Sequence, residues 1–68
     1  MLTQTREVLM RFHMSVDIDA MSGDPQAELS RILRYWAGNL KHYELAVGTS
    51  EQVFDSEYAQ VGTWDIAP

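Results

Sequence analysis

The chain has 68 residues, of which 46% are apolar and 22% charged, so the sequence predicts one small folded domain spanning 1–68 rather than a disordered segment. Ten Asp and Glu against five Lys and Arg give a net charge of −5, which argues against direct nucleic-acid binding and against binding to an anionic membrane. The absence of cysteine excludes disulfides and Cys-ligated zinc. Apolar runs are no longer than three residues, so we expect a cytoplasmic protein without a membrane span.

The first predicted element is a strand over about 6–19. Every even position from Val8 to Ile18 is apolar, and the odd positions are mostly polar, which is the pattern of a strand with one face on the core. Phe12 falls on the apolar face and is expected in the core. This strand is longer than its expected partners, so part of its edge would stay unpaired; we therefore expect a homodimer, unless the strand frays near Arg6 to Val8.

The second predicted element is a helix over about 25–42. Asp24 before Pro25 is a typical helix start, because Asp caps free N–H groups and proline at the first helical position loses no hydrogen bond. An apolar stripe with helical spacing then runs through Leu29, Ile32, Leu33, Trp36, Ala37, Leu40 and Tyr43. Gly38-Asn39 weakens the helix, and whether these two residues end it stays open.

The last third of the chain predicts a β-hairpin over about 51–66. Gln52 to Asp55 and Val61 to Ile66 form two short strands, joined by a connection from Ser56 to Ala59. Trp64 is expected to join the core by alternation. The predicted fold is α+β: a β-α-β-β domain with a three-stranded, mainly antiparallel sheet and one helix packed on one face.

The basic residues of the predicted helix mark a candidate partner-binding surface. Arg31, Arg34 and Lys41 are three and seven residues apart, which lines them along one helix edge. Tyr35 adds an aromatic side chain of the kind enriched at interfaces, and Tyr58 is a second such candidate. Two interpretations stay open: the edge pairs with acids of the same molecule or simply keeps it soluble, or it contacts an acidic surface of another protein.

The C-terminal hairpin carries acids and no base, which allows a second interpretation. Carboxylates spaced along strands can imitate the phosphates of DNA and occupy the nucleic-acid groove of another protein. The residues that would do so here are Glu51, Asp55 and Glu57. Ordinary solvated acids would give the same pattern.

Signals for catalysis or for a cofactor are weak. His13 and His42 are isolated and lack a metal-ligand spacing, and the serines have no base beside them in the sequence. Asp17 and Asp19 place two carboxylates on one face at the end of the predicted strand, but two ligands do not make a metal site. We therefore expect no cofactor and no enzyme; a small metal-dependent enzyme built on Asp17, Asp19 and a histidine is the third alternative.

Part of the chain resembles a group of short uncharacterised proteins of actinobacteria and their bacteriophages. The residues that carry the resemblance are DP at 24–25, RILRYWAGNLK at 31–41, DS at 55–56 and VGTW at 61–64. The group has no assigned activity and so implies no site residues. It implies an accessory protein of a phage or prophage, which would bind an unknown host or phage protein.

Overall fold

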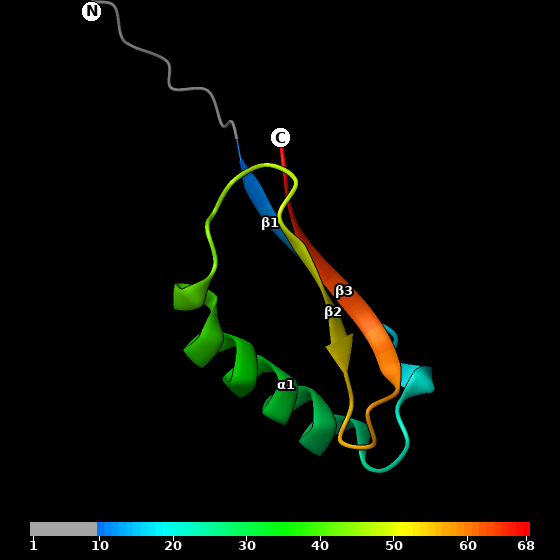
Figure 1. Cartoon of the computed structure of the whole chain (residues 1–68). Helices are drawn as coiled ribbons and strands as arrows, with labels where there is room; N and C mark the ends of the chain where they lie inside the picture. Colours follow the sequence, from blue (N-terminus) through cyan, green and yellow to red (C-terminus); the bar gives the residue numbers. More distant parts are fainter. Residues whose placement is uncertain (1–9) are drawn as a thin grey trace, which may run out of the picture.

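The computed structural model describes residues 10–68 as three strands and one α-helix. The elements are β1 (Arg11–Val16), the 3-10 turn η1 (Ile18–Ala20), α1 (Pro25–Asn39), the 3-10 turn η2 (Leu40–His42), β2 (Ser50–Phe54) and β3 (Gln60–Ala67). The strands form one antiparallel sheet in the order β1-β3-β2, and α1 lies across one face of it (Figure 1). The predicted α+β class and the β-α-β-β order are confirmed.

The first strand differs from its prediction at both ends. Residues 6–9 of the predicted strand lie outside the described residues. At the other end, the Asp17 N–H still donates to the Val61 carbonyl at 2.8 Å, but Ile18–Ala20 turns into η1. The prediction of a strand reaching residue 19 is therefore wrong at its end, because alternation of side chains does not reveal where the pairing partner stops.

Helix α1 begins where the sequence predicts. The Asp24 carboxylate accepts a hydrogen bond from the Ala27 N–H at 3.3 Å, and Pro25 occupies the first turn. The α-helix ends at Asn39, whose side-chain amide donates to the Tyr35 carbonyl at 2.6 Å. The chain then continues as the tighter turn η2 to His42, so the predicted span to 42 is helical but changes type after Asn39.

The β2–β3 hairpin is confirmed, with a bulge at Val53/Phe54. Gly62 of β3 lies opposite Val16 of β1, and there the two backbones come so close that a Cβ would overlap the Ser15 carbonyl oxygen and lie 2.9 Å from the Val16 Cα. The close approach at this position therefore requires glycine.

The core lies between α1 and the sheet, around two tryptophans. Trp64 on β3 is fully buried, and its ring centroid lies 5.3 Å from that of Trp36 on α1, with the planes at 77°. Tyr43 packs edge-on against Trp64 at 5.4 Å. The remaining buried apolar residues are Met21, Ile32, Val53, Val61 and Ile66. The prediction that Trp36 and Trp64 belong to the core is confirmed.

Two side chains predicted on the apolar faces are more exposed than expected. Phe12 contacts the Trp64 ring at 5.5 Å but is 45% exposed, and Leu33 is 51% exposed. Phe12 lies on the same face of the sheet as Trp64, but the single helix does not cover this end of the sheet. Leu33 lies on α1 outside the set of side chains that pack against the core. The prediction that Phe12 is a core residue is therefore wrong.

Candidate protein-binding groove

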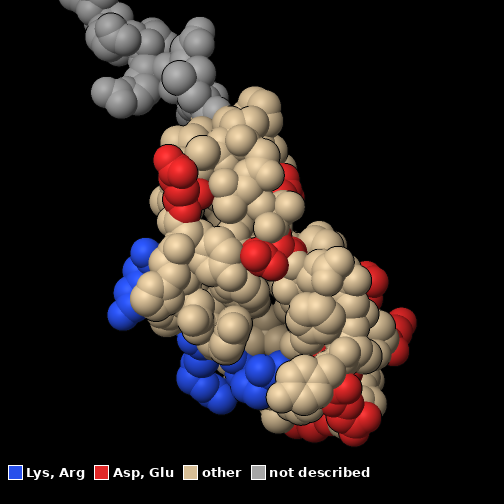
Figure 2. Space-filling view, viewed as in Figure 1, with Lys and Arg blue, Asp and Glu red and all other residues tan. Residues whose placement is uncertain are grey.

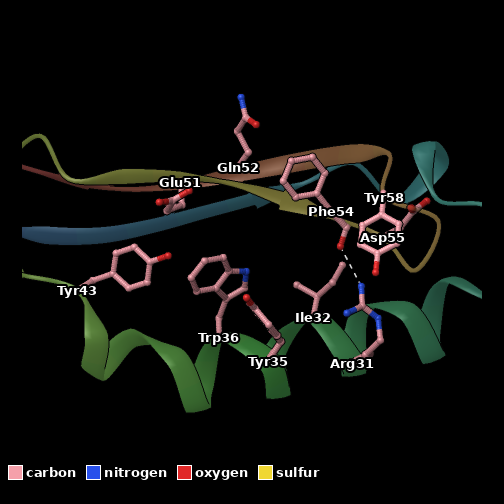
Figure 3. Close-up of a pocket in the computed structure, with 10 residues that line it drawn as sticks. All are labelled: Arg31, Ile32, Tyr35, Trp36, Tyr43, Glu51, Gln52, Phe54, Asp55 and Tyr58. Atoms are coloured by element: carbon pink, nitrogen blue, oxygen red, sulfur yellow. Dashed lines mark hydrogen bonds between the residues drawn. The ribbon is translucent and has the colours of Figure 1, made fainter.

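An open groove with a volume of about 250 Å³ lies between α1 and β2. Ile32 and Trp36 rise from α1 to form its floor, and Tyr35 lies beside them (Figure 3). The complete lining is Arg31, Ile32, Tyr35, Trp36, Tyr43, Glu51, Gln52, Phe54, Asp55 and Tyr58. We call this feature the α1–β2 groove. It is smaller and more open than the pockets that enclose small-molecule ligands, which measure about 300–1,000 Å³.

Aromatic side chains stand at the groove with much of their surface exposed. Tyr35 is 52% exposed and Tyr58 is 86% exposed. Tyr58 also has φ of 65°, the left-handed region that bulky residues rarely adopt. An exposed tyrosine in this conformation carries a backbone cost with little packing in return. The turn geometry requires this conformation, because Tyr58 is the last residue of the three-residue loop between Asp55 and Ala59 of the β2–β3 hairpin.

The outer edge of β2 forms the sheet side of the groove. The Ile66 N–H donates to the Thr49 carbonyl, and the Asp55 N–H donates to the Ala59 carbonyl. Backbone N–H and C=O groups alternate in direction along an antiparallel strand. Those of the odd-numbered residues of β2 therefore point toward β3, and those of Ser50, Gln52 and Phe54 point away from it. β2 is an outer strand of the sheet, so this side has no strand partner among residues 10–68.

The side chain of Arg31 is held by contacts within the molecule. One of its terminal nitrogens donates to the Phe54 carbonyl at 2.9 Å (Figure 3). Its Nε lies 3.5 Å from a Glu28 oxygen. Arg31 therefore pairs with an acid of the same molecule, which is one of the two interpretations of this helix edge, while Arg34 and Lys41 are exposed. Reversing the charge of Arg31 would disturb the packing of α1 on the hairpin as well as any partner.

The charges are segregated around the groove. Figure 2 shows Lys and Arg gathered over the α1 side of the hollow and Asp and Glu over the sheet and its loops. The groove lining brings together four of the predicted site residues, Arg31, Tyr35, Glu51 and Asp55, whereas Arg34, Lys41 and Glu57 lie outside it. Burial and the negative charge of Glu51 raise the pKa of Tyr43. The Tyr43 hydroxyl thus stays protonated at neutral pH.

Asp55 is not a surface carboxylate. It is 3% exposed, and its oxygens accept hydrogen bonds from the Glu57 and Ala59 N–H groups at 2.9 Å and from Ser22. The three residues Glu51, Asp55 and Glu57 therefore do not form a row of exposed charges. The expectation that Asp55 presents its carboxylate to another protein, as a mimic of a DNA phosphate, is wrong. An Asp that begins a hairpin loop and bonds the N–H two residues on is a familiar turn pattern, and that local signal could have identified it.

Loss of the Asp55 charge is expected to weaken the fold in acid. The Ala59 N–H, followed by the Glu57 N–H and Ser22, holds the pKa of Asp55 below its ordinary value despite the opposing effect of burial. A carboxyl with a lowered folded pKa stabilises the fold above its unfolded pKa of about 3.9, and this contribution is lost as the pH falls through the folded pKa.

The hydrogen bond from the Ser56 hydroxyl likewise lowers the pKa of Glu28, so both carboxyls act in the same direction. We expect the melting temperature to decrease once the pH is lowered past about 4. Asp55→Asn should lower it at pH 7 and flatten its decline in acid, as measured by circular dichroism between pH 2 and 7. Asp65→Asn, a carboxylate on the open face of the sheet, is the control. An Asp55→Asn melting profile that matches the parent at every pH would contradict this account.

The remaining sequence candidates do not converge. Asp17 precedes η1 and Asp19 lies within it, rather than both at the end of a strand. His13 is on β1 and His42 on η2. Within residues 10–68, no group of three or more His, Asp or Glu side chains is arranged to hold a metal ion.

Comparison with protein families, with curated proteins and with solved structures finds no match to this chain. No helix in the described part of the chain has the length and apolar character needed to cross a membrane.

Proposed function

We propose that this protein is a binding module, not an enzyme, and that it takes an extended segment of another protein into the α1–β2 groove. The observation that carries the proposal is the position of this groove beside the unpaired edge of β2. An extended segment can add to such an edge through its backbone and place every second side chain in the groove. Exposed aromatic side chains then supply contact area where the segment leaves the edge.

The charge around the groove favours an acidic segment. Arg34 and Lys41 are exposed on the helix side; of the two acids in the lining, Glu51 is exposed, whereas Asp55 is buried and bonded to backbone N–H groups. A segment with apolar side chains facing Trp36 and Tyr35, and acids toward the helix, would match both features. The burial of Asp55 counts against the alternative of DNA mimicry by the hairpin. An accessory role in a host cytoplasm, with a host or phage protein as partner, is what the resemblance to short proteins of actinobacteria and their bacteriophages implies.

The charge prediction is tested with synthetic peptides of about ten residues that alternate Leu or Phe with Asp, and with matched peptides that carry Lys instead. We expect the acidic series to bind in a fluorescence-polarisation titration and the basic series not to bind. Arg34→Glu combined with Lys41→Glu should weaken binding by about tenfold, more at low salt than at high salt. Thr63→Glu adds an acid on the open sheet face, outside the groove, and should not alter binding.

Two further variants test the geometry. Gln52→Pro removes an N–H that points away from β3, so the sheet should tolerate it while strand addition fails; Gln52→Ala keeps the N–H and should bind. Tyr58→Gly relieves the left-handed backbone and should weaken binding without lowering the melting temperature. Failure of every acidic peptide to bind, or equal binding by Gln52→Pro and Gln52→Ala, would contradict the proposal.

A further inference from the structure

The outer edge of β1 is the second unpaired edge of the sheet. Since the Asp17 N–H donates to the Val61 carbonyl of β3, the odd-numbered residues of β1 face β3. The backbone groups of Phe12, Met14 and Val16 therefore point away from the sheet. Among residues 10–68 no strand pairs with this edge.

β1 lacks the features with which proteins protect such an edge. It contains no proline, its ladder with β3 has no bulge, and its single charged side chain is Arg11. A regular edge without proline or bulge is a ready template for another strand.

The side chains next to the β1 edge are apolar and exposed. Met10 is 49% exposed, Phe12 45% and Leu45 59%. Together with Arg11 and Ile66 they line a shallow hollow at one end of the sheet. Exposed apolar surface beside an unpaired strand is typical of a face that another protein covers.

We propose that β1 pairs antiparallel with β1 of a second copy about a two-fold axis at Met14, giving a continuous six-stranded sheet. This register places Phe12 opposite the partner's Val16 on the helix side. On the open side it places Arg11 opposite the partner's Asp17, and the two-fold axis creates this pair twice. Shifting the register by two or four residues in one direction would put Arg11 opposite Ser15 or His13 and lose both ion pairs. A shift of two residues in the other direction would put it opposite Asp19, which lies in η1 and not in an extended strand. The pairing of Arg11 with Asp17 thus favours a second copy of this chain as the partner of β1, and it favours this register over the others.

A charge swap tests the register. Arg11→Glu sets an acid against the partner's Asp17 at both pairs, and should raise the dissociation constant of the dimer about tenfold in sedimentation equilibrium at low salt. Asp17→Arg should have the same effect; the Asp17 side chain makes no capping hydrogen bond, so its replacement leaves η1 intact. The combined variant, with Arg11→Glu and Asp17→Arg in one chain, restores both pairs and should regain the dimer.

A proline tests the strand pairing. Met14→Pro removes an N–H that points away from β3, so the fold should survive while the dimer is lost; Met14→Ala shortens the side chain but keeps the N–H and should remain dimeric. Circular dichroism checks that each variant is folded. Gln52→Pro, on the opposite edge of the sheet, should leave the dimer unchanged.

Restoration of the dimer by the combined charge swap supports the proposal, and it does so whether or not Met14→Pro folds. A full-length chain that is monomeric at millimolar concentration overturns it. A dimer that persists unchanged in Arg11→Glu and Asp17→Arg overturns it as well, because its interface would then lie elsewhere.

Discussion

Gly62→Ala is expected to push β1 away from β3 and to lower the free energy of unfolding by about 1–3 kcal/mol, a large part of the stability of a domain this small. The added Cβ would overlap the Ser15 carbonyl oxygen and lie 2.9 Å from the Val16 Cα. These are backbone atoms, so no side chain can rotate away and the strand itself must move. Forcing one methyl group into a packed site costs about 1–3 kcal/mol, and a domain this small is stabilised by only about 3–5 kcal/mol.

A second glycine provides the matched control. Gly38 lies within α1, and a Cβ there would meet nothing within 4 Å. Gly38→Ala should stabilise the helix by about 0.5–1 kcal/mol, so the same chemical change has opposite signs at the two positions. Urea unfolding followed by tryptophan fluorescence measures both. If Gly62→Ala and the parent protein had equal urea midpoints, the backbones of β1 and β3 would not be as close at residue 62 as the structure describes.

Trp64→Ala is expected to abolish cooperative folding. Trp64 is fully buried and contacts the rings of Phe12, Trp36 and Tyr43 at centroid distances between 5.3 and 5.5 Å. Replacing a buried Trp with Ala costs about 3–5 kcal/mol, which is comparable to the whole stability of a domain of this size. The near-ultraviolet circular dichroism of the paired indoles should disappear, and thermal unfolding should lose its sharp transition.

Trp64→Phe separates ring packing from the indole N–H. The Trp64 Nε1 is buried without a hydrogen-bond partner, so phenylalanine removes an unsatisfied donor while it keeps an aromatic ring. We expect Trp64→Phe to fold and to lose much less stability than Trp64→Ala. If both variants lost the same stability, ring packing would not be the main contribution of this residue.

Local signals in the sequence were enough to predict the elements. The Asp24-Pro25 start of α1 and the alternation along β1 depend on neighbouring residues, and both are confirmed. The strand order β1-β3-β2 depends on pairing between distant segments, which periodicity does not contain. The alternation of polar and apolar residues also places Phe12 on the correct face of the sheet. It does not show that α1 leaves this residue partly uncovered.

The candidate site could be predicted only in part, for a related reason. Arg31 and Tyr35 were identified from their place on one helix edge, and both line the α1–β2 groove. The groove itself arises from how far α1 lies from the edge of β2, which no local pattern encodes. The hydrogen bonds from Ser22 to Asp55 and from Ser56 to Glu28 join residues 33 and 28 positions apart, so they were invisible before the fold was known.

The central position of β3 bears on how the chain folds as it is made. β3 follows β1 and β2 in the chain, yet both hydrogen-bond to it and not to each other. As the ribosome extends the chain, α1 and the two outer strands emerge before the strand that joins them. The β2–β3 hairpin can then close locally, whereas β1 must wait for a partner about fifty residues downstream, and long-range pairing is the slow step in such topologies. A nascent chain halted before Gly62 would therefore hold two strand edges with nothing to pair them, a form suited to recognition by chaperones or proteases.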